Sequence, residues 1–314
     1  MNSHRYGKLI AAGLSLLMVT SLAACSDDTS DNSPDKPTDN PTSQATGFAQ
    51  DANTLVFGVV PDSVDTETNY QPLMDYIALK TGLSVKYYES TDYAALIEAA
   101  IAGKIDVASF SGFTYVIATN NGAKIVPISS IVTEAGAEPG YYSEAIVPLN
   151  STITTLADFK GKKVCFVDPS STSGYLFPSF ELLKLGISAE NDVTPVFAGK
   201  HDISVTKVAQ GVECEAGFAE DSQVALSDAV RVIQRTHVPG APIVVSDTLP
   251  DSVKTNLTQA LANVTIDQII AAGVAKADSD AFRSTFAATS PVNDAAYDLI
   301  RQICQQTGAK QCQA

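Results

Sequence analysis

Short apolar stretches alternate with helical patterns along this chain, and this alternation constrains the fold more than any other feature. Residues 54–60 have the composition of a strand, residues 70–80 that of a helix, and residues 84–88 that of the next strand. The same order recurs with a helix at 92–102 and a strand at 105–110. Strands that alternate with helices at this spacing indicate βαβ units around a parallel sheet.

A second set of alternating elements follows further along the chain. Apolar strand patterns occur at 163–167, 193–198 and 214–219, and a helical pattern at 202–210 separates the last two. Pro195 lies inside the middle strand and has no N–H to donate, which predicts an edge position. The chain therefore contains two α/β units.

We expect an α/β fold with two parallel-sheet-based lobes joined by two hinge crossings. The first lobe takes residues 54–142 and 242–314, and the second takes residues 143–241. The crossings fall at 141–148 and 238–242. In such a fold a ligand binds between the lobes, at the carboxyl ends of the strands.

Residues 1–24 have the features of a lipoprotein signal peptide. A positively charged start is followed by apolar residues 9–19, a stretch too short to span a bilayer. The run Leu22–Cys25 resembles a bacterial lipobox, which implies cleavage before Cys25 and lipidation of its sulfur. Ordinary secretion with a free Cys25 is the alternative, and the position of the cysteine in the lipobox argues against it.

Residues 25–50 are expected to form a lipid-anchored disordered tether, because Ser26–Gln44 contains almost nothing apolar. Loss of the signal would move the formal net charge from −15 to −17. This argues against nucleic acid and against electrostatic adhesion to membranes, so the lipid should be the sole membrane contact. A small anionic ligand stays possible, because salt screens distant charge beyond roughly 8–10 Å.

Four further cysteines, Cys165, Cys214, Cys304 and Cys312, form an even set in an oxidising compartment. Of the three possible pairings we favour Cys165–Cys214, on two predicted strands of one lobe, and Cys304–Cys312, which closes a short loop. A metal site is disfavoured because the C-x₂-C spacing and nearby histidines are missing.

The segment Asp168–Tyr175 carries three adjacent hydroxyl residues between the strand at 163–167 and a helical pattern that ends at Gly186. A helix amino terminus has unpaired N–H groups and partial positive charge, so it can hold an anion. The alternative is an ordinary Ser/Thr cap of the helix.

Six short segments, which follow one another along the chain, resemble those of the phosphate/phosphite/phosphonate substrate-binding lipoproteins of ABC importers. These lipoproteins have a type 2 periplasmic-binding-protein fold. The resemblance covers about residues 54–305. Each motif alone is weak, and the hydroxyl turn together with the Gly-x-His-Asp element is more specific. The segments are Leu55–Pro61, Asp92-Tyr93, Ile105–Phe110, Asp168–Tyr175, Gly199–Asp202 and Cys214–Asp221.

The resemblance implies that Ser171, Thr172 and Ser173 bind the phosphoryl oxygens. Tyr93 from the first lobe and His201 from the second would donate to the same group. Without the resemblance, Tyr93 on a helix stripe fits a core position and His201 fits a helix cap.

Phe110 and Asp221 complete the set of implied ligand-binding residues. Some family members have a tyrosine where Phe110 stands, so here it supplies an apolar wall or a simple core residue. Asp221 is either a solvated acid or the acceptor of a proton from the ligand.

The resemblance also bears on the ligand. Members that take an aminoalkylphosphonate place an acid near the second crossing, where this chain has Ala241. Because a buried ammonium without a partner is costly, we expect phosphite, phosphate or a short alkylphosphonate.

The expected function is that of an extracytoplasmic substrate-binding lipoprotein of an ABC importer. It would be a monomer that delivers its ligand to a permease and ATPase complex, and it would be no enzyme, with no cofactor or metal. Common catalytic and nucleotide-binding motifs are missing from the sequence. The alternatives are a phosphoesterase-like hydrolase using His201 and a serine, or a solute-sensing lipoprotein on the same fold.

Overall fold

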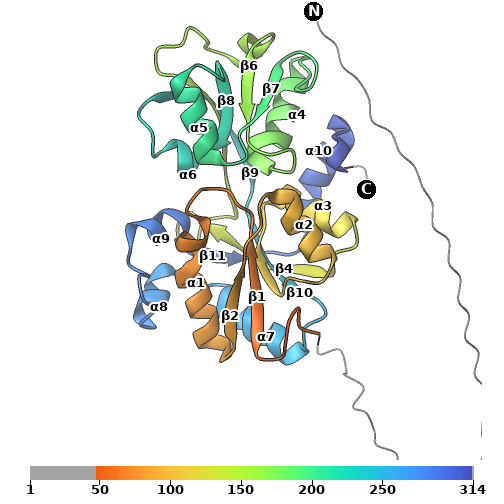
Figure 1. Cartoon of the computed structure of the whole chain (residues 1–314), viewed down its shortest axis with the longest axis vertical. Helices are drawn as coiled ribbons and strands as arrows, with labels where there is room; N and C mark the ends of the chain where they lie inside the picture. Colours follow the sequence, from red (N-terminus) through yellow and green to blue (C-terminus); the bar gives the residue numbers. More distant parts are fainter. Residues whose placement is uncertain (1–46, 313–314) are drawn as a thin grey trace, which may run out of the picture. The chain divides into compact units, whose positions relative to one another are not determined.

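The computed structural model describes residues 47–312, which form two β-sheets with helices packed on their faces (Figure 1). The predicted signal peptide, the lipidated Cys25 and most of the predicted tether lie outside these residues. Phe48 and Ala49 pack against the core of the first sheet, so the described chain joins this sheet earlier than residue 54. None of the helices in residues 47–312 is long and apolar enough to cross a membrane.

The first sheet has six strands in the order β11-β4-β10-β3-β1-β2. Strands β2, β1 and β3 are parallel, and β10, β4 and β11 extend the sheet in antiparallel pairs. The strands are β1 (Thr54–Val59), β2 (Ser84–Tyr88), β3 (Val107–Ser109), β4 (Ile125–Val132), β10 (Pro242–Ser246) and β11 (Ala288–Pro291).

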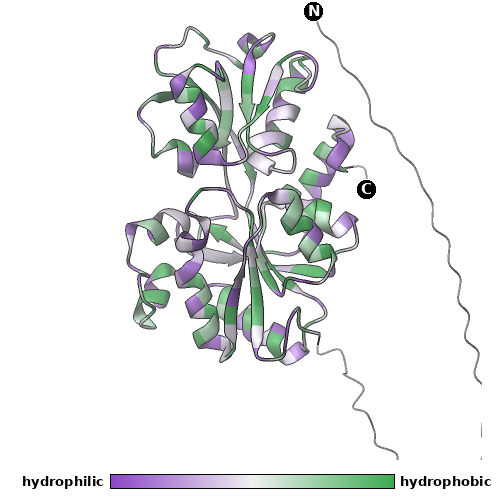
Figure 2. Ribbon diagram, in the orientation of Figure 1, coloured by the Kyte–Doolittle hydropathy of each residue, from purple (hydrophilic) through white to green (hydrophobic). Residues whose placement is uncertain are grey.

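Both faces of the first sheet are buried, because successive side chains of a strand point to opposite sides. Leu55 and Phe57 pack in a cluster with helices α1, α7, α8 and α9, whereas Val56 packs in another with α2, α3 and α10. Figure 2 shows hydrophobic residues running along the strands of this sheet. The helices are α1 (Thr66–Thr81), α2 (Tyr93–Ile101), α3 (Gly112–Asn120), α7 (Asp251–Leu261), α8 (Ile266–Ala271), α9 (Asp280–Thr285) and α10 (Asp298–Thr307).

The second sheet has five strands in the order β7-β6-β8-β5-β9, with β7, β6 and β8 parallel. Strands β5 and β9 complete this sheet and pair with each other in antiparallel fashion along their length. Its elements are β5 (Gly140–Pro148), β6 (Lys163–Phe166), the π-helical turn η2 (Thr172–Leu176), α4 (Phe177–Lys184), β7 (Thr194–Phe197), α5 (His201–Gln210), β8 (Ala216–Glu220), α6 (Asp221–Val224) and β9 (Val230–Pro239).

We call the six-stranded sheet with its helices the first lobe, and the five-stranded sheet with its helices the second lobe. These names follow the predicted division at residues 142–143 and 241–242, which stays a prediction. The lobes are in direct contact, because Leu176 and Phe177 of the second lobe belong to the same hydrophobic cluster as Phe113 and Ile300.

The α/β fold class predicted from the sequence is confirmed, with one correction: both sheets are mixed rather than parallel. Strand β4 was missed because Pro127 and the adjacent Ser129 and Ser130 interrupt its apolar pattern. Pro195 lies on β7 at the edge of the second sheet, as predicted.

Two disulfides occur in the pairing favoured from the sequence. Cys165 on β6 is bonded to Cys214 just before β8, with the Cα atoms 5.6 Å apart. Cys304 on α10 is bonded to Cys312, with the Cα atoms 5.5 Å apart. The first bond ties neighbouring strands of the second lobe, and the second fixes the chain after α10, which packs against α3 and α4.

Candidate functional site

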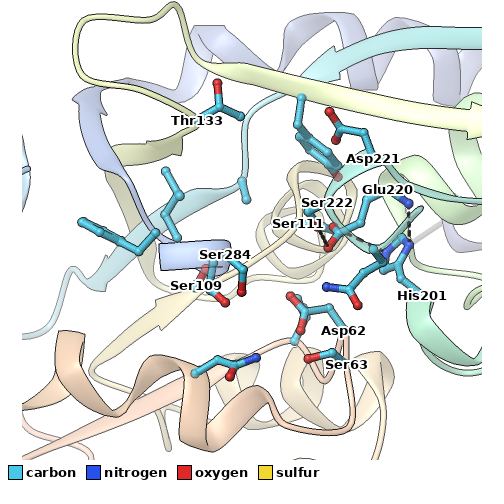
Figure 3. A pocket seen from close by; sticks show the side chains of 18 of the residues that line it. Asp62, Ser63, Ser109, Ser111, Thr133, His201, Glu220, Asp221, Ser222 and Ser284 are labelled. Atoms are coloured by element: carbon cyan, nitrogen blue, oxygen red, sulfur yellow. Dashed lines mark hydrogen bonds and ion pairs between the residues drawn. The ribbon is translucent and has the colours of Figure 1, made fainter. Parts of the chain in front are cut away.

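A cavity of about 220 Å³ lies between the two sheets, where both lobes contribute side chains (Figure 3). It lies where the expected ligand site was placed, at the carboxyl ends of β1, β3 and β8. Four of the residues predicted to bind ligand line it: Tyr93, Phe110, His201 and Asp221. Ala241, expected beside the ligand, lines it too, and residues that line it without having been predicted include Asp62, Tyr70, Ser109, Ser111, Tyr141, Glu220 and Ser222.

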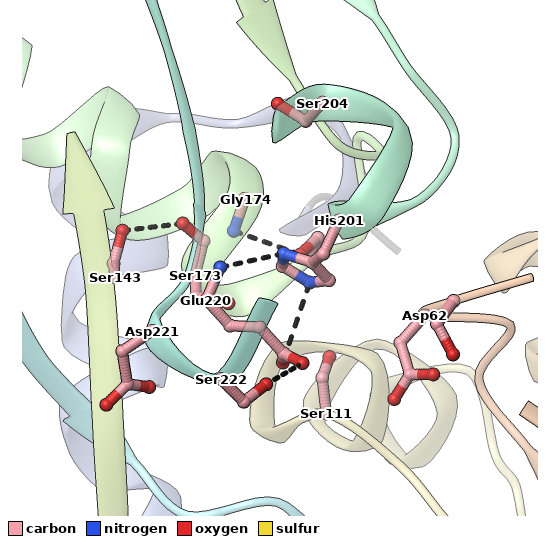
Figure 4. A network of polar contacts seen from close by, with 12 residues as sticks. Asp62, Ser111, Ser143, Ser173, Gly174, His201, Ser204, Glu220, Asp221 and Ser222 are labelled. Atoms are coloured by element: carbon pink, nitrogen blue, oxygen red, sulfur yellow. Dashed lines mark hydrogen bonds and ion pairs between the residues drawn. The ribbon is translucent and has the colours of Figure 1, made fainter. Parts of the chain in front are cut away.

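His201 is the first residue of α5, and its side chain is almost completely buried, with 2% of the residue exposed. Its Nδ1 accepts a hydrogen bond from the backbone N–H of Glu220 at 2.9 Å. Burial lowers the pKa of His201 to about 4, so the ring is neutral at neutral pH. The remaining proton must then be on Nε2, and this donor lies 3.9 Å from Oε2 of Glu220 (Figure 4).

Tyr93 and Phe110 form part of the first-lobe wall of the cavity. Tyr93 begins α2, and Asp92 caps this helix by accepting the N–H of Ala95 at 2.8 Å. Burial, followed by the charges of nearby acids, raises the pKa of Tyr93 well above its usual value, so the phenol keeps its proton. Phe110 follows β3, is fully buried, and offers an apolar surface.

The three hydroxyl residues of the second lobe are buried and do not line the cavity. Ser171 caps the turn by accepting the N–H of Gly174 at 3.0 Å. Thr172 Oγ1 accepts the N–H of Phe113, in the first lobe, at 2.8 Å. The buried hydroxyl of Ser173 has no hydrogen-bond partner among the described residues.

Tyr141 connects this hydroxyl turn to the cavity. Its residue lines the cavity on β5. Burial raises the pKa of its phenol, while the hydroxyls of Ser173 and Thr172 act in the opposite direction. The phenol group of Tyr141 therefore lies near the hydroxyls of the turn, and the residue lines the cavity. Sequence reasoning missed it because residue 141 reads only as part of a crossing strand.

Asp221 lies at the cavity, yet its carboxylate is held by groups of the second lobe. One oxygen accepts the N–H of Tyr142 at 3.2 Å, and the other accepts from Arg235 at 3.3 Å. Arg235 also forms an ion pair with Glu144 at 2.6 Å. These contacts hold the Asp221 carboxylate against β5 and β9, and its predicted role in ligand binding stays a prediction.

Two other acids face each other across the cavity: Asp62 from the loop after β1 and Glu220 from the end of β8 (Figure 4). Burial raises the pKa of Glu220 to about 7. Burial, followed by the charge of Glu220, raises the pKa of Asp62 to about 6. Glu220 could have been found from the sequence, because it directly precedes the predicted Asp221, and Asp62 directly follows the family-like segment Leu55–Pro61.

The start of α5 also holds the two lobes together beside the cavity. The Lys200 ammonium donates to the carbonyl oxygens of Pro61 and Ser63, at 3.3 and 2.9 Å. The backbone N–H of His201 donates to the carbonyl oxygen of Asp62 at 2.9 Å. His201 thus faces the cavity with its side chain and joins the two lobes through its backbone.

Comparisons with known proteins identify the family of this chain. Residues 57–297 match the profile of a family described as ABC transporter, phosphonate, periplasmic substrate-binding protein. The phosphate-import protein PhnD of Mycolicibacterium smegmatis is 33% identical over 290 residues, covering 85% of this chain and 89% of the relative.

Two solved structures share the fold. The binding protein component of a phosphonate ABC transporter from Pseudomonas aeruginosa has a TM-score of 0.69 at 22% identity, covering 82% of this chain and 87% of that chain. PhnD1 from Prochlorococcus marinus, solved in complex with methylphosphonate, has a TM-score of 0.69 at 18% identity, with 82% and 99% covered. Both similarities support the type 2 periplasmic-binding-protein fold.

Proposed function

The chain belongs to the family of periplasmic substrate-binding proteins of phosphonate ABC transporters, and we propose that it captures a small phosphorus oxyanion between its two lobes. The observation that carries this proposal is the His201 side chain. It is a buried, neutral N–H donor at the wall of a cavity that both lobes line, and its Nε2 makes no hydrogen bond with the described residues, the Glu220 carboxylate oxygen being 3.9 Å away. A buried polar group without a partner is costly, so a bound oxygen would stabilise it.

The phosphoryl oxygens accept hydrogen bonds from His201, Tyr93 and Ser173 in this proposal. The role of Ser173 is supported by its hydroxyl, which has no hydrogen-bond partner among the described residues. The role of Tyr93 is supported by its phenol, which keeps its proton and can therefore donate it. Ser171 and Thr172 shape the turn, because their hydroxyl oxygens accept hydrogen bonds from the backbone N–H groups of Gly174 and Phe113. Their hydroxyl protons stay available to donate to the ligand.

Phe110 and Asp221 have supporting roles in the same proposal. Phe110 is an apolar wall, and Asp221 keeps the ends of β5 and β9 in place through Arg235. Ala241 at the cavity supplies no charge for an amine. This favours phosphate, phosphite or a short alkylphosphonate, a range that includes the phosphate named for the mycobacterial relative and the methylphosphonate of the Prochlorococcus complex.

Membership of the family makes this protein an extracytoplasmic component of an ABC transporter, which works with a permease and an ATPase. The family consists of binding proteins rather than enzymes, which favours transport over the hydrolase alternative. We further propose that the protein is a monomer anchored through lipid on Cys25, as the lipobox-like run Leu22–Cys25 supports.

Calorimetric titration of the protein with phosphate, phosphite and methylphosphonate tests the proposal. We expect one molecule bound per chain for at least one of the three ligands, with no turnover of p-nitrophenyl phosphate in the same buffer. Absence of binding for all three, or steady release of p-nitrophenol, would contradict it.

A further inference from the structure

The cavity is larger than the oxyanion that it should receive. Its volume of about 220 Å³ corresponds to about seven water molecules at roughly 30 Å³ each, whereas phosphate is a single phosphorus atom with its oxygens. Ser109 and Ser284, which also line the cavity, lie across it from His201 (Figure 3). An oxyanion held at His201 therefore leaves room in the cavity for a substituent on phosphorus.

Two carboxamide side chains belong to the residues that line this cavity, one in each lobe. Asn69 is part of α1 in the first lobe, and Gln223 is part of α6 in the second. Both residues are half-buried, and neither carboxamide makes a hydrogen bond with another described residue. A carboxamide offers two N–H donors and a carbonyl acceptor, so both kinds of contact are available to a ligand.

Hydroxyl groups and apolar side chains complete this part of the lining. The hydroxyl oxygens of Tyr70 and Ser109 lie 3.2 Å apart, and Ser284 Oγ donates to the carbonyl oxygen of Ala281 at 2.8 Å. Ile131 adds an apolar surface. Such a mixture suits a short carbon chain that carries a neutral polar group.

The charges around the cavity disfavour a substituent that carries its own charge. Asp62 and Glu220 would repel a carboxylate. Arg283 is the one arginine or lysine among the described lining residues, and it is exposed, with its Nε donating to the carbonyl oxygen of Asp278 at 3.2 Å. Burial raises the pKa of Asp62 to about 6 and that of Glu220 to about 7, which reduces the negative charge available to an ammonium.

We propose that the cavity binds phosphorus oxyanions that carry a short hydroxyalkyl group, and that Asn69 and Gln223 recognise its hydroxyl. This inference rests on the proposed function and names a substrate class within it. A hydroxyl group is both a donor and an acceptor, so it can accept from the N–H of one carboxamide and donate to the carbonyl oxygen of the other. A site built to bond a hydroxyl disfavours an analogue that lacks it, because its own polar groups then stay unpaired.

The phosphonates 2-hydroxyethylphosphonate and propylphosphonate are the matched probes, because they differ only in a terminal hydroxyl against a terminal methyl group. We expect calorimetry at pH 7 to show the wild-type protein binding the hydroxylated probe about tenfold more tightly. Two hydrogen bonds, each contributing about threefold, account for this preference.

Alanine variants assign the preference to the two carboxamides. Asn69→Ala and Gln223→Ala should each reduce it to about threefold, and the double variant should bind the two probes about equally. The preference is a ratio measured on one protein, so a general loss of affinity cancels. Gln71→Ala is the matched control and should keep the tenfold ratio, because Gln71 is an exposed residue of α1 that donates to Asp75 at 2.8 Å and does not line the cavity.

Equal affinities of the wild-type protein for the two probes, or a preference that the double variant retains, would overturn this inference. The inference would also be wrong if 2-aminoethylphosphonate or phosphonoacetate bound at least tenfold more tightly than 2-hydroxyethylphosphonate, because a charged group would then occupy this part of the cavity. Binding of phosphate without binding of any of these phosphonates would overturn the inference and leave the proposed function intact. If phosphate, phosphite and methylphosphonate all failed to bind, the proposed function itself would fail.

Discussion

The hydroxyl turn (residues 170–174) and the His201–Glu220 edge are two neighbouring parts of the second lobe that use their polar groups in different ways. The turn directs its groups toward protein: Thr172 accepts from Phe113, and the Ser170 carbonyl accepts from Thr114 at 3.1 Å. The edge leaves the His201 donor and the Glu220 carboxylate facing the cavity.

This difference shows that polar residues at the amino terminus of a helix can either hold the two lobes together or bind a ligand. Both parts follow strands of the same sheet and both contain residues suited to an oxyanion. What separates them is whether a partner within the protein already satisfies each group, and buried groups are rarely left without one. Ser173 is the member of the turn whose hydroxyl has no partner among the described residues, so we propose that it binds the ligand together with the His201–Glu220 edge.

The largest effect should come from the edge. Removing the donor with His201→Ala takes away a charge-assisted hydrogen bond, so we expect affinity for methylphosphonate to fall about a hundredfold. His237→Ala is the matched control, because His237 on β9 packs edge-on against Tyr142 and does not line the cavity. A His201→Ala protein within about twofold of wild type would return His201 to a purely structural role.

The next effect concerns how the free energy of unfolding of the ligand-free protein depends on pH. The folded-state pKa of Glu220, about 7, lies above the ordinary value of 4.5 for a glutamate. Stability from this group is therefore present below pH 4.5 and is lost as pH rises to about 7. Glu220→Gln lacks this loss, so its free energy of unfolding relative to wild type should increase by about 3 kcal/mol between pH 4.5 and 7.5.

Chemical denaturation across this pH range measures the effect, and Ser173→Ala serves as a variant of the turn without an ionisable group. The difference between Ser173→Ala and wild type should stay constant with pH. A Glu220→Gln curve parallel to wild type would show that the edge carries no unpaired charge.

A smaller effect is expected where the turn meets the first lobe. Thr172→Ala leaves the buried N–H of Phe113 without its acceptor and should weaken ligand binding about tenfold by disfavouring the closed lobes. Thr172→Ser keeps the hydroxyl and should stay near wild type. If the serine variant bound as poorly as the alanine variant, the methyl group rather than the hydrogen bond would explain the role of Thr172.

The sequence predicted the strands and helices that build the parallel cores, because their hydrophobic periodicity is local. It missed β4 and β11, since antiparallel additions to a sheet depend on partners distant in the chain: β11 pairs with β4 across more than a hundred and fifty residues. The same limit applies to the site. Residues in recognisable motifs, such as His201, were found, whereas Asp62 and Tyr141 line the cavity from positions outside those motifs.

A crystal structure of the protein with methylphosphonate tests the central claim most directly. We predict a phosphonate oxygen within hydrogen-bond distance of Nε2 of His201, with the Glu220 carboxylate facing the same ligand and the Ser173 hydroxyl donating from the turn. A phosphonate bound elsewhere, with Nε2 of His201 still unpaired, would contradict the account.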